Sequence, residues 1–203
     1  ITSPLFSIWY WLNHDDGLLD SLRIVTFSVV SVVTTTGYAV NDYTQWGGFA
    51  VMVFFYLTFI GGCSGSTSGG LKMFRFQVAY ALLRANLKQL VHPRAVIRQQ
   101  YNGHPLDEEI VRSILTFSFF FTMTIGVLAL CLAMLGLDPL TALTGAASAV
   151  CNVGPGLGPI IGPAGNFSPL PDAAKWLLAV GMLLGRLEII TVLVLLTRAF
   201  WRH

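Results

Sequence analysis

The chain of 203 residues is 54% hydrophobic and only 11% charged, with a formal net charge of +2 at pH 7. This composition and a mean hydropathy of +0.68 are typical of a membrane protein and argue against the ordinary soluble classes. Seven of the twelve Lys and Arg residues lie between Lys72 and Arg112, whereas six of the ten acidic residues lie in other connections. The positive-inside rule therefore places the basic segment in the cytoplasm and the acidic connections outside.

The first predicted elements are the aromatic end of a helix over residues 1–14 and a short apolar helix over 18–33. Because the chain starts with Ile1 and not Met, we expect it to be a piece of a longer polypeptide. The second helix would rise only about 24 Å, less than the ~30 Å of hydrocarbon in a bilayer. The acidic residues Asp20 and Asp42 place both of its ends outside. We therefore predict a re-entrant pore helix that enters and leaves the membrane on one side.

A broken helix is predicted over residues 45–90, interrupted by the glycine-rich loop 61–70. The loop is not a phosphate-binding P-loop, because Gly70 is followed by Leu71 before Lys72. Its serines also lack the spacing of a serine-hydrolase elbow. Irregular backbone at membrane depth is tolerated only where it is buried in protein or lines a wet cavity. We therefore predict that this loop lines a cavity.

The second half of the chain repeats the pattern of the first. A cytoplasmic linker, which we expect to meet anionic lipid and not nucleic acid, leads into a helix over 107–137. A pore helix over 139–150, a polar turn over 151–156 and a helix over 172–199 follow. Aligning Gly37 with Gly154 also aligns Ser31 with Ser148. The sequence thus predicts a tandem repeat with its units at 1–106 and 107–203.

The turn that follows each pore helix has the composition of a cation filter. Extended backbone beside a glycine can direct successive carbonyl groups at a cation, and the negative end of the helix dipole favours the same charge. The two candidate turns are 34–38 and 151–156. A glycine C-cap is the ordinary alternative for either turn taken alone, and the presence of two such turns in parallel repeats favours a pore.

Arg186 is a second candidate, because it lies near the middle of the last apolar run. A charge at this depth costs at least ~2.5 kcal/mol on insertion scales, and such residues usually face water. Glu188 is an unsuitable partner, because residues two apart lie on different faces of a helix. A membrane-embedded serine enzyme is a weaker alternative, since no His or Asp lies in the apolar segments to activate a serine.

Five motifs in order, TTTGY, IGGCSGSTSGGLK, NVGPGLG, GRLE and FWR, resemble those of the Trk-type potassium uptake proteins in the Trk/Ktr/HKT cation-transporter superfamily. The resemblance implies an all-α, multi-pass protein of the bacterial inner membrane that takes up K⁺ and holds no covalently bound cofactor. Four units, each made of a helix, a pore helix and a second helix, would surround its K⁺-channel-like pore. This chain would supply the third unit, without most of its first helix, and the fourth.

The resemblance also implies roles for individual residues and for partners. The filter would consist of Thr35, Thr36, Gly37 and Tyr38 with Asn152, Val153, Gly154 and Pro155; the gate would consist of Gly61, Gly62, Ser64, Gly65, Gly69, Gly70 and Arg186. A cytosolic, TrkA-like nucleotide-binding subunit would dock on the basic inner face, and the full-length protein would form a homodimer. Transport of Na⁺ or of a K⁺/Na⁺ mixture stays open as an alternative.

Overall fold

The computed structural model describes residues 2–13, 17–62, 69–92, 100–101, 104–105 and 108–187. Helices dominate these residues, as predicted. The elements are α1 (Thr2–Asn13), α2 (Leu18–Val33), the 3₁₀ turn η1 (Tyr43–Trp46), α3 (Gly48–Phe59), β1 (Ile60–Gly61), β2 (Leu71–Lys72), α4 (Met73–Val91), β3 (Gln100–Tyr101), β4 (His104–Pro105), α5 (Glu108–Met134), α6 (Pro139–Cys151) and α7 (Asp172–Arg186).

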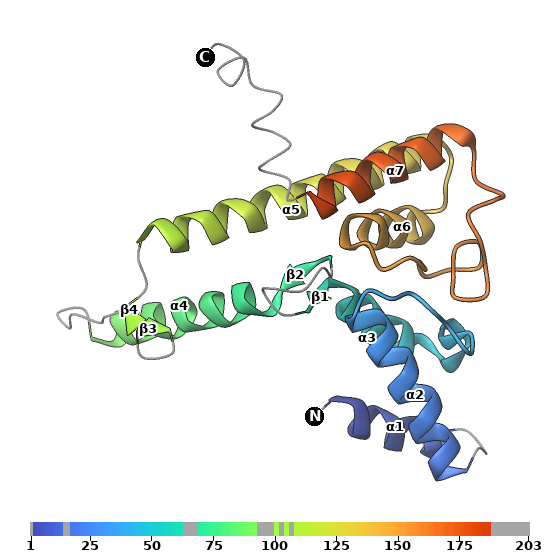
Figure 1. Cartoon of the computed structure of the whole chain (residues 1–203), viewed down its shortest axis with the longest axis horizontal. Coiled ribbons are helices and arrows are strands. Elements are labelled where there is room, and N and C mark those ends of the chain that lie inside the picture. The colour runs from blue at the N-terminus through green and yellow to red at the C-terminus, as the bar shows by residue number, and fades with distance from the viewer. Residues whose placement is uncertain are drawn as a thin grey trace.

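Helices α1, α2 and α3 form the first group (Figure 1). Helix α2 buries Val25, Val29 and Val32, which recur at the spacing of one helical face. Asp42 caps the η1 turn, since its carboxylate accepts a hydrogen bond from the Thr44 backbone N–H at 3.0 Å. This turn brings Tyr43 onto Phe54 of α3, with stacked rings 4.0 Å apart. The predicted broken helix therefore starts at Gly48, after a separate capped turn, and not at residue 45.

Helices α5, α6 and α7 form the second group, in which α6 packs against both long helices (Figure 1). Helix α6 starts with a capping carboxylate, since Asp138 accepts from the Leu140 N–H at 3.1 Å, and Pro139 suits a first-turn position. Every residue from 144 to 151 is buried. Helix α5 ends at Met134, three residues before the predicted end, because the chain turns at Gly136 with φ 87°.

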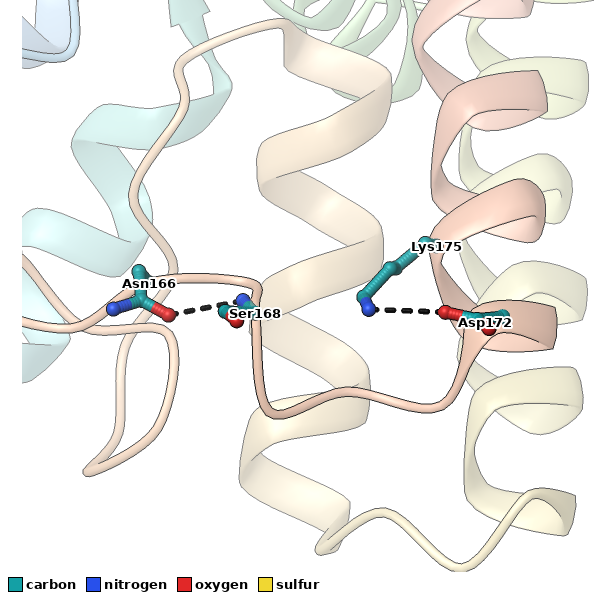
Figure 2. A network of polar contacts seen from close by, with 4 residues as sticks. All are labelled: Asn166, Ser168, Asp172 and Lys175. Carbon is teal, nitrogen blue, oxygen red and sulfur yellow. Dashed lines mark hydrogen bonds and ion pairs between the residues drawn. The ribbon is translucent and has the colours of Figure 1, made fainter.

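The loop between α6 and α7 places three apolar side chains in the hydrophobic core: Leu157, Ile161 and Leu170. Within the loop, the Asn166 side-chain oxygen accepts a hydrogen bond from the Ser168 N–H at 2.9 Å (Figure 2). At the start of α7, the Lys175 ammonium lies 3.0 Å from the Asp172 carboxylate, one helical turn away. Both contacts join residues close in the chain. They stabilise the start of α7 and the loop before it, and they do not connect α7 to another helix.

The two groups meet where α3 contacts α6, and one hydrophobic core runs through both. Two short strand pairs were not predicted. Strands β1 and β2 pair in parallel, with Ile60 opposite Leu71, and so join the two ends of the glycine loop. Strands β3 and β4 form a small antiparallel pair. Strands of two residues are too short to show an alternating pattern in a sequence.

Among the residues that the structure describes, one helix is long and apolar enough to cross a membrane. This is α5, with a mean hydropathy of 2.1 over its best window. Helices α3 and α6 are apolar but shorter. The predicted final helix over 172–199 is described as far as Arg186, and the rest of that prediction lies outside the described residues.

Thr144 holds the loop that follows the second turn. Its hydroxyl accepts a hydrogen bond from the buried Leu157 N–H at 3.1 Å and lies 2.8 Å from the Leu157 carbonyl oxygen. We expect Thr144→Val, which keeps the shape but removes the hydroxyl, to lower the free energy of unfolding by about 1–3 kcal/mol, the cost of a buried group left unpaired. Thermal unfolding of the detergent-purified full-length protein measures this.

The matched control for that substitution is Thr122→Val on α5, where an exposed hydroxyl donates to the Ser118 carbonyl of its own helix at 3.0 Å. We expect little change there. Equal melting temperatures for the two variants would contradict the role given to Thr144.

Candidate functional site

The turns that follow α2 and α6 share one hydrogen-bond pattern. The Thr36 N–H donates to the Ser31 carbonyl at 2.9 Å, and at the equivalent positions the Val153 N–H donates to the Ser148 carbonyl at 3.0 Å. Likewise the N–H groups of Thr35 and Asn152 each donate to the carbonyl three residues earlier, both at 3.0 Å. The alignment of Gly37 with Gly154 therefore pairs positions of equal local geometry.

Backbone angles give the same correspondence. Thr35 and Asn152 have φ values of 56° and 55°, and they are the only non-glycine residues with positive φ in the described part of the chain. Asn adopts this left-handed conformation readily, whereas a β-branched Thr does so rarely. Gly37 and Gly154, two residues further on, also have positive φ, at 78° and 113°. The left-handed residue is the C-cap of α6, Asn152, and in the first turn it is Thr35, which directly follows the C-cap Thr34 of α2. Both chains then continue as irregular backbone.

The two turns lie directly against each other. A Cβ atom built on Gly37 would be 2.2 Å from the Val153 carbonyl oxygen, which no side chain can occupy. A Cβ built on Gly154 would have the Gly37 Cα as its nearest neighbour, at 3.7 Å. The close approach requires glycine at residue 37 because the neighbouring atom belongs to the backbone.

Hydroxyl and carbonyl oxygens provide the polar surface of the first turn. The Thr34 hydroxyl lies 2.7 Å from the Val30 carbonyl, to which it donates, and 2.8 Å from the Thr36 hydroxyl. Since Thr34 uses its single hydrogen on Val30, Thr36 is the donor to Thr34. The lone pairs of the exposed Thr36 oxygen are then available to a cation. Tyr38 is 73% exposed, with its ring away from the packed core.

No group of three or more His, Cys, Asp or Glu that could hold a metal ion occurs among the described residues. A cation at these turns would therefore be held by backbone and hydroxyl oxygens. The ends of α2 and α6 carry the partial negative charge of a helix C-terminus. This donor set suits a monovalent cation stripped of its water.

Two glycines from other elements contact the last carbonyl groups of α6. A Cβ on Gly69, at the end of the glycine loop, would be 2.0 Å from the Cys151 carbonyl oxygen, and one on Gly185 of α7 would be 1.8 Å from that of Val150. The Asn152 amide also donates to the Met182 carbonyl of α7 at 3.1 Å. The second turn is thus in contact with the glycine loop and with α7.

Some of the predicted gate residues lie near this end of α6. Gly61 pairs with Lys72, and the Gly62 carbonyl accepts a hydrogen bond from the Met73 N–H at 3.2 Å. Gly69 contacts α6, whereas Ser64 and Gly65 lie outside the described residues.

The remaining gate residues, Gly70 and Arg186, flank these contacts. Gly70 has φ 73°, and Arg186 is exposed at the last residue of α7, directly after Gly185. The contact made by Gly185 was not predicted. Its only signal in the sequence is a glycine inside a helix beside a charged residue.

The sequence matches the family model named TrkH, described as cation transport protein, over residues 19–202. The chain belongs to the TrkH family. It is 67% identical over 183 residues to "Trk system potassium uptake protein TrkI" of Halomonas elongata, a match that covers 90% of this chain and 37% of that protein.

Other TrkH-family relatives match along nearly the whole chain. The Trk system potassium uptake protein TrkH of Escherichia coli K12 is 35% identical over 196 residues, which cover 97% of this chain and 40% of that protein. The crystal structure of the potassium transporter TrkH from Vibrio parahaemolyticus superposes with a TM-score of 0.90 at 36% identity, covering 98% of this chain and 42% of that one. The chain therefore spans about two fifths of the length of these relatives.

Membership of the TrkH family confirms the resemblance identified in the motifs. The structural similarity at a TM-score of 0.90 confirms the helical fold class. A cation transport protein is not an enzyme, so the prediction against catalysis is confirmed as well. The description of the family as cation transport proteins likewise supports a membrane protein.

Proposed function

We propose that the full-length protein takes up potassium across the bacterial inner membrane as a multi-pass protein, with this chain forming the third and fourth units of its pore. The observation that supports this most directly is the contact between two turns of equal geometry, at Gly37 and Val153. A filter needs several equivalent backbone segments around one path. The names of the relatives support K⁺ as the transported ion.

In this proposal the filter consists of residues 35–38 and 152–155, together with two further turns from the upstream half. Carbonyl oxygens replace water around the ion, and the C-terminal ends of α2 and α6 lower the energy of a cation between them. The Thr36 hydroxyl adds an oxygen whose lone pairs are available.

The proposed gate lies beneath the second turn. Gly69 ends the loop that joins α3 to α4 and already contacts the end of α6. Arg186 follows Gly185, which contacts the same end of α6 from α7. The loop, through Gly69, and the residue before the arginine, Gly185, therefore contact the same end of α6. In this proposal a change at either place alters the cation path at the second turn.

Arg186→Ala tests the electrostatic part of the gate. If the guanidinium repels cations in the pathway, the variant should pass K⁺ faster, by about tenfold, since tenfold corresponds to only ~1.4 kcal/mol and two like charges ~4 Å apart at a protein surface repel each other by more than that. Tracer flux into proteoliposomes that contain the full-length protein measures the change. Arg84→Ala, on the exposed part of α4, is the matched charge control. Unchanged flux at equal incorporation would exclude this role for Arg186.

The test of the function itself is rescue of a K⁺-uptake-deficient bacterium at low external K⁺ by the full-length protein. Growth that depends on the protein and survives excess Na⁺ would support potassium uptake. Growth that Na⁺ abolishes by competition would support the Na⁺ or mixed K⁺/Na⁺ alternative. No rescue despite correct membrane insertion would contradict the proposal.

The basic inner face is the proposed contact for a cytosolic, TrkA-like nucleotide-binding subunit, and the full-length protein is proposed to be a homodimer. The Arg75 guanidinium lies 3.6 Å from the centre of the Phe117 ring, so α4 and α5 are joined on this face. Lys88 in the last turn of α4 extends the positive charge. Co-purification of such a subunit, lost on reversing these charges, tests the contact.

A further inference from the structure

Two buried serines lie at equivalent positions near the ends of the pore helices that precede the proposed filter turns. Ser31 on α2 and Ser148 on α6 are 5% and 2% exposed, respectively. Their carbonyl groups make the same bond in the two turns, to the N–H groups of Thr36 and Val153. Their hydroxyl groups do not. The Ser148 oxygen accepts from the Gly154 N–H at 3.2 Å, whereas the Ser31 hydroxyl donates to the Tyr38 carbonyl at 2.6 Å.

The bond to Gly154 fixes the direction of a carbonyl group. In a trans peptide the C=O and N–H groups point in opposite directions, so a Gly154 N–H directed back at Ser148 turns the Val153 carbonyl away from α6. That carbonyl oxygen is the atom against which Gly37 packs. No other acceptor for the Gly154 N–H occurs in the described part of the chain.

The first turn reaches the same arrangement without its hydroxyl. The Gly37 N–H donates to the Ser31 backbone carbonyl at 3.3 Å, so the Thr36 carbonyl already points away from α2. The Ser31 hydroxyl only draws the Tyr38 carbonyl back towards the helix. The carbonyl before the glycine therefore depends on a side chain in the second turn and on backbone alone in the first.

We infer that Ser148 is a positioning residue for ion selectivity, acting through the Val153–Gly154 peptide, and that Ser31 serves the filter to a smaller extent. This inference rests on the proposed function, because selectivity has meaning only if the turns conduct ions. Ser148→Ala should leave the fold intact, since Ala favours helix more than Ser does. A cavity of about 250 Å³, lined mainly by apolar side chains, adjoins Ser148 and Gly154, so its lining offers the freed N–H little to replace the hydroxyl and hold the peptide in place.

The experiment measures the K⁺/Na⁺ permeability ratio of the full-length protein in proteoliposomes, with the melting temperature of each variant. We expect Ser148→Ala to lower the ratio about tenfold, the factor set by one lost hydrogen bond, and Ser31→Ala to lower it less than about threefold. Ser148→Thr keeps the hydroxyl, and the cavity accommodates its methyl group. It should therefore retain the ratio.

The control is Ser28→Ala, because Ser28 is equally buried on α2 but its hydroxyl donates only to the Ile24 carbonyl of the same helix, at 2.9 Å. Its ratio should not change. An unaltered ratio in Ser148→Ala, or an equal fall in Ser28→Ala, would overturn the inference while the proposed function stands. Absence of K⁺ flux through the unaltered protein would overturn the proposed function and this inference with it.

Discussion

Replacement of Gly37 with Ala is expected to reduce potassium uptake by at least about 100-fold, because a displacement that costs ~3 kcal/mol corresponds to that factor. The added methyl group would lie 2.2 Å from the Val153 carbonyl oxygen and 3.2 Å from the Pro155 ring. Neither neighbour can rotate away as a flexible side chain could. The positive φ of 78° adds a penalty that Ala pays and Gly does not. The two turns must therefore separate.

Two other glycines serve as graded controls for this prediction. Gly154→Ala shares the positive φ, but its nearest contact is at 3.7 Å, so strain is added without a clash. Gly126→Ala on α5 meets nothing within 4 Å. Uptake at low external K⁺ should fall most for residue 37, less for residue 154 and least for residue 126. A Gly37→Ala variant that transports like the Gly126→Ala variant would show that the turns do not meet as described.

Gly185→Ala is expected to lower the free energy of unfolding by about 3 kcal/mol, the upper range for forcing a methyl group into a packed interior. The new Cβ would lie 1.8 Å from the Val150 carbonyl oxygen. Helix α7 must then move away from α6, which also breaks the hydrogen bond from the Asn152 amide to the Met182 carbonyl. Loss of transport should accompany the loss of stability, since Val150 belongs to the last turn before the proposed filter.

Thermal unfolding of the detergent-purified full-length protein measures this second effect. Gly126→Ala is again the control, and it should be neutral or slightly stabilising because Ala is the better helix former. The α7 contact would be disproved by a Gly185→Ala protein that melts at the same temperature as the Gly126→Ala protein.

Much of the fold followed from composition and periodicity. The limits of α2 at 18–33 agree with the prediction, and α6 at 139–151 differs by one residue. The repeat alignment was informative because it rested on pattern, not identity. It paired Thr35 with Asn152, two unlike residues that share one backbone conformation. Turns of this kind are stabilised by hydrogen bonds between residues close in the chain, so the spacing of residues in the sequence can predict them.

Contacts between elements could not be predicted in the same way. The approaches of Gly69 and Gly185 to α6 depend on how three helices and a loop pack, and a glycine has no side chain to indicate its neighbour. The different bonds of the Ser31 and Ser148 hydroxyls also escaped prediction, since the two residues are identical in sequence and in alignment. Whether the hydroxyl donates or accepts depends on whether a carbonyl or an N–H of its own turn faces it, and the residue names do not specify this.

The left-handed conformation of Thr35 has a consequence for engineering. A β-branched residue with φ 56° carries strain of about 1–3 kcal/mol, which Asn or Gly would largely relieve. Directed evolution for thermostability should therefore replace Thr35 early. The expected substitution is Thr35→Asn, because the equivalent turn already has Asn at residue 152. At residue 35 a gain in thermal stability is therefore expected to come with a loss of the threonine's contribution to transport.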